Sequence, residues 1–370
     1  MFQSKIQNFL YQKIAKPIFF KIDPELIHDL IIIVGQVLGS NPITRYLTKL
    51  CFYHSDKSLE QTILGINFKS PIGLAAGFDK NAKIINTIAD VGFGFEEIGS
   101  VTGEPCAGNP KPRLWRLPKA NGLVVYYGLK NNGCEEIVSR LKNKKFNIPV
   151  GVSIAKTNSP DTCETRAEIA DYKKAYETFI DSGVGDYFTI NVSCPNAFGG
   201  EPFSDPERLK MLLSELDKIE TKKPIFIKIA VDITIGELNE ITKVADSHRV
   251  HGFVIANLTK DKTRGEINGS LPKEAKGGIS GRPTFEASNK LISHLYKNTG
   301  DKYVIIGVGG VFSAEDAYKK IKCGASLVQL ITGMIFEGPQ LIGQINKGLV
   351  ELLKKDGFSN ISEAIGATHK

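Results

Sequence analysis

The sequence predicts a (β/α)8 barrel preceded by a small helical extension. Eight short apolar runs alternate with segments of helical spacing over roughly 290 residues, which is the strand count and size of such a barrel. The chain has 370 residues, 42% hydrophobic and 24% charged, enough for one barrel and an appendage. The alternative, an open doubly wound sheet, usually carries a G-x-G-x-x-G turn after its first strand, and this sequence has none there.

The eight runs that we interpret as barrel strands are Pro71–Phe78, Phe95–Val101, Pro149–Ala155, Tyr187–Ser193, Pro224–Ala230, Gly252–Leu258, Tyr303–Gly309 and Ser326–Thr332. Between them, Pro206–Ile219 and Ala314–Lys322 show helical spacing. Extra residues at Glu104–Gly133 contain two short apolar segments that flank Asn121-Gly122, which predicts a hairpin. We expect this insertion to roof the barrel mouth.

The N-terminal residues predict two helices, which we assign with the residues up to 57 to an extension, leaving 58–370 for the barrel. Residues 2–22 form a basic amphipathic segment. Asp23 then reads as an N-cap and Pro24 as the first residue of an apolar helix that ends near Gly39. These helices either pack on the main domain or lie on anionic lipid; lipid contact is favoured by Phe19, Phe20 and Ile31–Ile33 and by lysines at Lys5, Lys13, Lys16 and Lys21. No apolar run is long enough to cross a membrane.

Composition narrows the function class only in part. The six cysteines form no C-x-x-C pair, so we predict neither a metal site nor a disulfide framework. Scattered free cysteines are typical of a reducing, intracellular compartment, which we therefore predict. The formal net charge of +7 suits nucleic acid, anionic lipid or an anionic small ligand, and it does not choose among them.

Polar residues gather where the predicted strands end, which is where a barrel places its active site. The fourth run ends in Asn191-Val192-Ser193-Cys194-Pro195-Asn196, which points to ligand binding, with a capped turn around a buried thiol as the alternative. Lys228 lies inside an apolar strand, where an unpaired ammonium is costly. We expect Lys228 to face an anion or an electron-rich ligand, with a structural ion pair as the alternative. The other strand ends contribute Ala75–Lys80, Ser100, Ser153, Lys156, Asn257 and Thr259.

Glycine-rich segments indicate a phosphate site. Gly307–Gly310 follows the seventh run, Thr332-Gly333 follows the eighth, and Gly277–Pro283 supplies a third glycine loop. Loops after the last two strands of a barrel commonly bind phosphate through backbone amides. Together with Lys228, they predict a phosphorylated cofactor across the barrel mouth, with its electron-accepting ring near Lys228.

These motifs resemble the dihydroorotate dehydrogenase family, FMN-dependent (β/α)8 flavoenzymes of pyrimidine synthesis. The resemblance covers nearly the whole chain, through Gly73–Lys80, Glu97–Thr102, Asn109–Arg113, Asn191–Asn196, Gly277–Pro283, Gly307–Gly310 and Gly324–Thr332. Asp23–His28 resembles the opening of the membrane-associated, quinone-reducing class 2, whose N-terminal helices frame a quinone tunnel. The resemblance therefore implies oxidation of dihydroorotate to orotate, reoxidation by a membrane quinone, peripheral contact with anionic lipid at the cytoplasmic face of the cell inner membrane, and no nucleic-acid partner.

The resemblance also implies roles for individual residues. Cys194 would be the base that removes a proton from C5 of dihydroorotate, and Lys228 would stabilise the reduced flavin. Orotate contacts would come from Lys80, Asn191, Asn196 and Asn257. FMN contacts would come from Ala76, Gly77, Phe78, Asp79, Lys80, Ser100, Ser153, Asn191, Lys228, Ala256, Gly281, Gly310, Ile331 and Thr332.

The sequence departs from the class 2 pattern at three places. Cys194 is the base type of the soluble class 1 enzymes, whereas class 2 normally carries serine. Val125 stands where the family usually has an asparagine that binds the substrate. Ser153 and Ala256 replace the usual Asn and Thr, which leaves fewer polar contacts to FMN.

Three alternatives remain open on the sequence. A soluble class 1-like dihydroorotate dehydrogenase would use fumarate or NAD. A flavin-dependent tRNA dihydrouridine synthase would share a basic FMN barrel with a cysteine, but would need a helical RNA-binding domain for which few residues remain after Thr332. A non-catalytic phosphate- or flavin-binding barrel would explain the glycine loops but would assign no role to Lys228 and Cys194.

Overall fold

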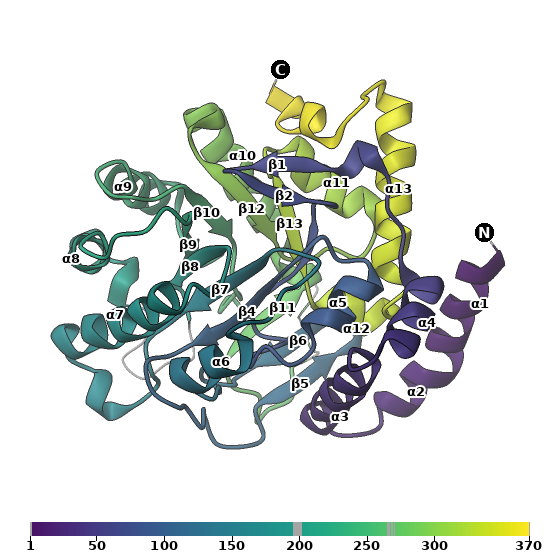
Figure 1. The fold of residues 1–370 in the computed structure, drawn as a ribbon, viewed down its shortest axis with the longest axis horizontal. Helices are drawn as coiled ribbons and strands as arrows, with labels where there is room; N and C mark the ends of the chain where they lie inside the picture. Colours follow the sequence, from purple (N-terminus) through teal and green to yellow (C-terminus); the bar gives the residue numbers. More distant parts are fainter. Residues whose placement is uncertain (1, 195–201, 265–266, 268, 270, 370) are drawn as a thin grey trace.

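Eight parallel strands close into a barrel in this computed structural model, which describes residues 2–194, 202–264, 267, 269 and 271–369 (Figure 1). The strand order around the barrel is β10-β12-β13-β3-β4-β7-β8-β9. Every predicted run contains one barrel strand, so the predicted fold class is confirmed. The strands are β3 (Ile72–Leu74), β4 (Phe95–Val101), β7 (Val150–Ile154), β8 (Tyr187–Asn191), β9 (Ile225–Ile229), β10 (Gly252–Ile255), β12 (Val304–Val308) and β13 (Leu327–Leu330).

The barrel interior changes from apolar to polar along the strands. Successive side chains of a strand point to opposite sides, so residues two apart share the interior. Near the strand starts, the interior holds a buried apolar cluster that includes Phe95, Tyr187 and Phe226. Two residues further along the same strands stand Glu97, Thr189 and Lys228, all buried. The barrel is therefore filled by apolar side chains at one end and presents polar ones toward its mouth.

Helices cover the outside of the barrel, with α7, α8 and α9 on one side and α13 on the opposite side, beside the N-terminal helices (Figure 1). The segment predicted at Ala314–Lys322 is helix α11, and Pro206–Ile219 contains α8. The helices are α5 (Ile85–Val91), α6 (Cys134–Leu141), α7 (Thr165–Ser182), α8 (Pro206–Leu216), α9 (Ile235–Ala245), α10 (Phe285–Thr299), α11 (Ala314–Lys322), α12 (Thr332–Glu337) and α13 (Leu341–Asp356).

A three-stranded antiparallel sheet stands at the barrel mouth, where β6 lies between β5 and β11. The predicted hairpin is β5 (Leu114–Leu117) and β6 (Gly122–Val125). The third strand, β11 (Gly278–Gly281), was not predicted. The interpretation of Gly277–Pro283 as a glycine loop is thus wrong for most of its length, because Gly278–Gly281 pairs with Gly122–Val125.

The N-terminal extension holds one helix more than predicted. Residues 2–19 are helical as α1 (Phe2–Leu10), the π-helical turn η1 (Tyr11–Ala15) and α2 (Lys16–Phe19). Helix α3 (Pro24–Leu38) begins as predicted, since the Asp23 side chain accepts hydrogen bonds from the backbone N–H groups of Glu25 and Leu26. Helix α4 (Pro42–Phe52) was not predicted. A small hairpin, β1 (Gln61–Ile63) and β2 (Ile66–Phe68), leads into the barrel.

Within the part of the chain that the structure describes, no single helix has the length and apolar composition needed to span a membrane. Helices α3 and α4 meet that composition only when taken together, and the chain bends by 114° between them.

Polar contacts fix the extension to the barrel. Arg113, directly before β5, donates to both carboxylate oxygens of Glu25, with Nη2 2.7 Å from Oε1. Arg116 donates to the backbone carbonyl of Ile22 at 2.7 Å, and the Tyr11 hydroxyl donates to the carbonyl of Ile335 at 2.6 Å. The N-terminal helices therefore pack on the main domain, which is one of the two alternatives given above. Their outer face stays exposed.

Candidate active site

A cavity of about 950 Å³ opens at the carboxyl ends of the barrel strands, beneath the β5–β6–β11 sheet. A second cavity of about 510 Å³ adjoins it. The two have seven lining residues in common: Ala76, Lys228, Asn257, Leu258, Ser280, Ile331 and Thr332. One elongated ligand could therefore occupy both cavities.

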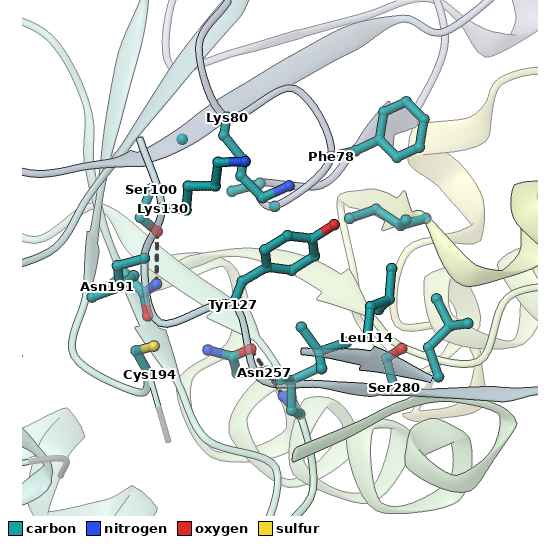
Figure 2. Close-up of a pocket in the computed structure, with 18 of the residues that line it drawn as sticks. Phe78, Lys80, Ser100, Leu114, Tyr127, Lys130, Asn191, Cys194, Asn257 and Ser280 are labelled. Carbon is teal, nitrogen blue, oxygen red and sulfur yellow. Dashed lines mark hydrogen bonds between the residues drawn. The ribbon is translucent and has the colours of Figure 1, made fainter. Parts of the chain in front are cut away.

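Figure 2 shows two ends of the larger cavity, with Tyr127 between them. Cys194 and Asn191, from the end of β8, lie at one end, and Phe78 lies at the other. Lys80 and Lys130 extend along one side of the Tyr127 ring. One end thus carries groups suited to acid–base chemistry, and the other faces the N-terminal extension through Phe78 and His28.

Hydrogen bonds hold the carboxamides in place at the Cys194 end. Asn191 Nδ2 donates to Ser100 Oγ at 2.8 Å, and Ser100 Oγ lies 2.7 Å from Ser153 Oγ. Asn257 Nδ2 donates to the backbone carbonyl of Ser193 at 2.8 Å, while the Ser193 hydroxyl donates to Asn191 Oδ1 at 3.2 Å. Residues from β4, β7, β8 and β10 are therefore connected before any ligand arrives.

Lys228 is a buried cation in the barrel mouth. It stands next to Asn191 in the register of β8 and β9 and lines both cavities. Burial lowers the pKa of Lys228, and the negative charges of Glu97 and Cys194 oppose that shift. Among the described residues, Lys228 forms no ion pair with a carboxylate within 4.0 Å, and Glu97 affects it only through its charge, so the structural ion-pair alternative is not supported. A bound group that gains negative charge would be stabilised here.

Lys80, at the end of β3, links the cavity to the extension. Its Nζ lies 3.9 Å from the centre of the Tyr127 ring and 3.4 Å from Nε2 of His28 on α3. Burial, followed by the charge of Lys130, lowers the pKa of Lys80 to about 7. Burial, followed by the charge of Lys80, lowers the pKa of His28 to about 4, so this imidazole is neutral at pH 7.

The smaller cavity is a cradle of glycines. Gly281, Gly309, Gly310 and Gly333 line it together with Thr284 and Thr332. Gly309 has φ +109°, and a Cβ on it would lie 2.4 Å from Thr284 Oγ1, so a side chain there would be strained and would clash. Close approach of the backbone to a ligand, after the seventh and eighth barrel strands, fits a phosphate group.

The structure brings most of the predicted site residues together. Ala76, Gly77, Lys80, Ser100, Asn191, Cys194, Lys228, Asn257, Ile331 and Thr332 line the larger cavity, and Ala256, Gly281 and Gly310 line the smaller one. Ser153 lines neither cavity and reaches the site only through Ser100. Asn196 lies outside the described residues.

Sequence reasoning did not assign site roles to His28, Tyr127, Lys130, Leu258 or Ser280, all of which line the larger cavity. Tyr127 and Lys130 belong to the predicted insertion Glu104–Gly133, so its expected position over the barrel mouth was the available signal. His28 had no such signal, because only the docking of α3 brings it to the cavity.

Comparison with known proteins decides the family. The model of the family described as dihydroorotate dehydrogenase matches residues 58–353. The chain belongs to the dihydroorotate dehydrogenase family. A relative named dihydroorotate dehydrogenase (quinone) from a Sulfurovum species is 40% identical over 98% of this chain and 99% of that protein. Another with the same name, from Nautilia profundicola, is 39% identical over 95% of each chain.

Solved structures of dihydroorotate dehydrogenases share the fold. The enzyme of Eimeria tenella in complex with ferulenol has a TM-score of 0.83 and 32% identity, over 94% of this chain and 96% of that chain. The ligand-free form has a TM-score of 0.81. The match to the Sulfurovum relative covers 98% of this chain, so it includes most of the N-terminal helices as well as the barrel. Family membership also removes the tRNA-modifying alternative.

Proposed function

We propose that this chain oxidises (S)-dihydroorotate to orotate for pyrimidine synthesis, uses FMN as its flavin, and is reoxidised by a membrane quinone. The observation that carries this proposal is the convergence of Cys194, Lys228, Asn191 and Asn257 on one cavity that continues into the glycine cradle. Membership of the dihydroorotate dehydrogenase family supports the reaction, and the names of the relatives support the quinone.

The residues present fit FMN. The glycine cradle suits its phosphate, and the shared lining of the two cavities suits a molecule that runs from the cradle to Lys228. Gly281, Gly310 and Thr332 would hold the phosphate end, while Ala76, Ser100 and Asn191 would border the ring. When bound, FMN supplies the acceptor for the hydride that leaves C6 of the substrate.

Cys194 is the base in this proposal. It lies at the cavity end that holds both carboxamides, where a substrate ring bound by Asn191 and Asn257 would present its C5 proton. An unperturbed thiol has a pKa of about 8.5, much closer to neutral pH than a serine hydroxyl. The cysteine therefore gives this extension-bearing chain the base of the soluble class.

Charged and polar side chains bind the substrate. The Lys80 ammonium would pair with the substrate carboxylate, while Asn191 and Asn257 would bind the ring. Val125, half-buried on β6, faces the cavity without a hydrogen-bonding group. Its presence predicts weaker substrate binding than an asparagine at that place would give.

The outer face of the extension supports membrane contact. Of the 18 exposed large apolar side chains among the described residues, 16 lie between Ile6 and Tyr53. Soluble monomers rarely gather so much exposed apolar surface, which marks interaction sites. With the exposed Lys13 and Lys21 on the same segment, it suits an anionic leaflet. We place the enzyme as a peripheral protein on the cytoplasmic face of the cell inner membrane.

The test separates the two half-reactions. L-dihydroorotate is added anaerobically to the purified protein, flavin bleaching is followed, and quinone, fumarate and NAD are then offered separately. We expect bleaching, then fast reoxidation by quinone alone. Reoxidation by fumarate or NAD at the faster rate would instead identify a class 1-like enzyme, and absence of bleaching would refute dihydroorotate as substrate.

A truncated protein tests the role of the extension. Deleting Met1–Leu38 removes Glu25, the partner of Arg113, and should therefore lower stability. The truncated protein that folds should still reduce its flavin with dihydroorotate, but should lose both quinone turnover and binding to anionic vesicles. Each lysine near an anionic leaflet contributes about 1 kcal/mol, so salt should weaken vesicle binding of the full chain. Full-rate reduction of a long-chain quinone by the truncated protein would refute this role.

A further inference from the structure

A buried lysine outside the catalytic cavity lies behind the glycine cradle. Lys320, on α11, has 0% relative exposure. Its Nζ donates to Ser288 Oγ at 2.8 Å and to Asn289 Oδ1 at 3.0 Å, both on α10. Within the described part of the chain these hydrogen-bond partners are neutral. A buried ammonium with no carboxylate beside it costs stability, so its presence calls for a compensating charge.

The neighbouring charges do not provide that compensation, because they are paired with one another. Both terminal nitrogens of Arg282 donate to the Asp316 carboxylate at 2.8 and 2.9 Å. Lys319 Nζ pairs with Glu286 at 2.9 Å. Cys323 is close by, but burial raises the pKa of its thiol, which is therefore neutral at pH 7.

Two connections lead from Lys320 to the cradle. Ser288 Oγ, which accepts from Lys320, donates to the backbone carbonyl of Val308 at 2.6 Å, and Val308 lines the smaller cavity directly before Gly309 and Gly310. The Lys320 Nζ also lies 5.0 Å from the centre of the Phe285 ring. Phe285 packs so closely on Gly310 that a Cβ there would come within 2.5 Å of it.

We propose that Lys320 is a specificity-determining residue for the phosphorylated cofactor: its ammonium stabilises the FMN phosphate from behind the glycine loop, without touching it, and favours FMN over riboflavin. The inference rests on the proposed function, since it takes the cradle as the phosphate site. A phosphate dianion in the cradle supplies the negative charge that the protein does not place beside Lys320. The low polarity of the surroundings lets the two charges interact across the loop.

The same arrangement predicts a pH dependence of cofactor binding. Burial lowers the pKa of Lys320 to about 7; the charges of Asp316 and Glu286 oppose this shift only in part, and the charge of Arg282 adds to it. A bound phosphate dianion raises this pKa, so FMN binding takes up a proton above pH 7. Affinity for FMN should therefore be highest between about pH 6, above which the phosphate is a dianion, and pH 7, and should fall as the pH rises further toward the raised pKa of Lys320.

The decisive experiment compares Lys320→Met with Lys319→Met. Lys319 is its chain neighbour but sits half-exposed in a surface pair with Glu286, so it controls for loss of one positive charge on α11. FMN release from each holoenzyme on dilution is followed by flavin fluorescence at pH 7, and riboflavin-loaded protein is measured in parallel. We expect Lys320→Met to weaken FMN binding about tenfold, which is about 1.4 kcal/mol, and to leave riboflavin binding and Lys319→Met unchanged.

Several results would overturn the inference. Unchanged FMN release in Lys320→Met would do so, and equal losses of FMN and riboflavin would show a merely structural lysine. If neither Lys320→Met nor Lys320→Gln folds, the wild-type pH dependence decides: FMN affinity that does not fall above pH 7, or falls equally for riboflavin, contradicts the proposal. A purified protein that binds no flavin contradicts the proposed function itself, whereas FMN binding without these effects contradicts only the role of Lys320.

Discussion

Replacing Glu25 with glutamine should destabilise the protein by about 3 kcal/mol, because Glu25 is the buried carboxylate that fixes α3 to the barrel roof. Its side chain is 4% exposed and accepts hydrogen bonds from Arg113. The Nζ atoms of Lys130 and Lys111 lie 3.4 and 3.5 Å from Glu25 Oε1. Burial alone would raise the pKa of Glu25, but hydrogen bonds and charge from Arg113, then the two lysines, lower it to about 2.

The magnitude follows from that shift. An unfolded glutamate has a pKa of about 4.3, so a fall to about 2 corresponds to roughly 3 kcal/mol at neutral pH. Breaking one side of a buried ion pair costs about 3–5 kcal/mol in other proteins, which agrees. Because the folded pKa is depressed, the contribution is complete above the unfolded pKa and is lost as the pH falls from about 4 toward 2.

Urea unfolding of both proteins at pH 7 and at stepwise lower pH provides the measurement. The matched control is Glu136→Gln, which removes the exposed pair with Arg140 one helical turn away and should leave the free energy of unfolding nearly unchanged. A Glu25→Gln protein as stable as the control at pH 7 would refute the argument. So would a difference that persists unchanged down to pH 2.

Three further predictions concern the reaction. Cys194→Ala should retain FMN and lose most of its flavin reduction by dihydroorotate in stopped flow; a normal rate would identify another residue as the base. Lys228→Ala should slow the same step on the order of 10²-fold, as expected for one preorganised electrostatic group, and wild-type kinetics would contradict its role. Orotate affinity, read from flavin absorbance, should fall as the pH rises above 7, because Lys80 has a pKa of about 7 and only its ammonium attracts the carboxylate; Lys80→Met should remove that dependence.

The barrel was predictable because its signal is repetitive. Buried parallel strands read as continuous apolar runs, and each run here is followed by a helical segment, so eight local patterns agree. Strand β11 gave no such pattern. Gly278-Ile279-Ser280-Gly281 is half glycine, and only its pairing with β6 makes it a strand.

Helix α4 shows a different difficulty. Asn41 and Pro42 form an N-cap and a first helical residue, a recognisable start. The large apolar residues that follow, including Ile43, Leu47 and Leu50, are exposed in the structure rather than buried. The apolar residues of α4 therefore face outward, whereas the apolar face of a helix usually packs on a core. For this reason the sequence pattern did not indicate a helix packed in the domain.

The site was predictable wherever it stands at a strand end. Lys228 and Cys194 follow from their place along the chain, because the barrel geometry brings all carboxyl ends of the strands together. His28 comes from outside the barrel strands, and its position depends on how α3 docks. Long-range docking of this kind leaves no local trace in the sequence.

Because the N-terminal extension is bound to the β5–β6 hairpin, the two segments can be exchanged between relatives only together. Arg113 directly precedes β5 and Arg116 lies within it, and their partners, Glu25 and Ile22, belong to α3 and to the turn before it. A chimera that takes these helices from a relative but keeps the native insertion risks an arginine buried without its carboxylate. The segment to be exchanged is consequently discontinuous in the sequence, and a chimera should take residues 1–57 and 104–133 from the same protein.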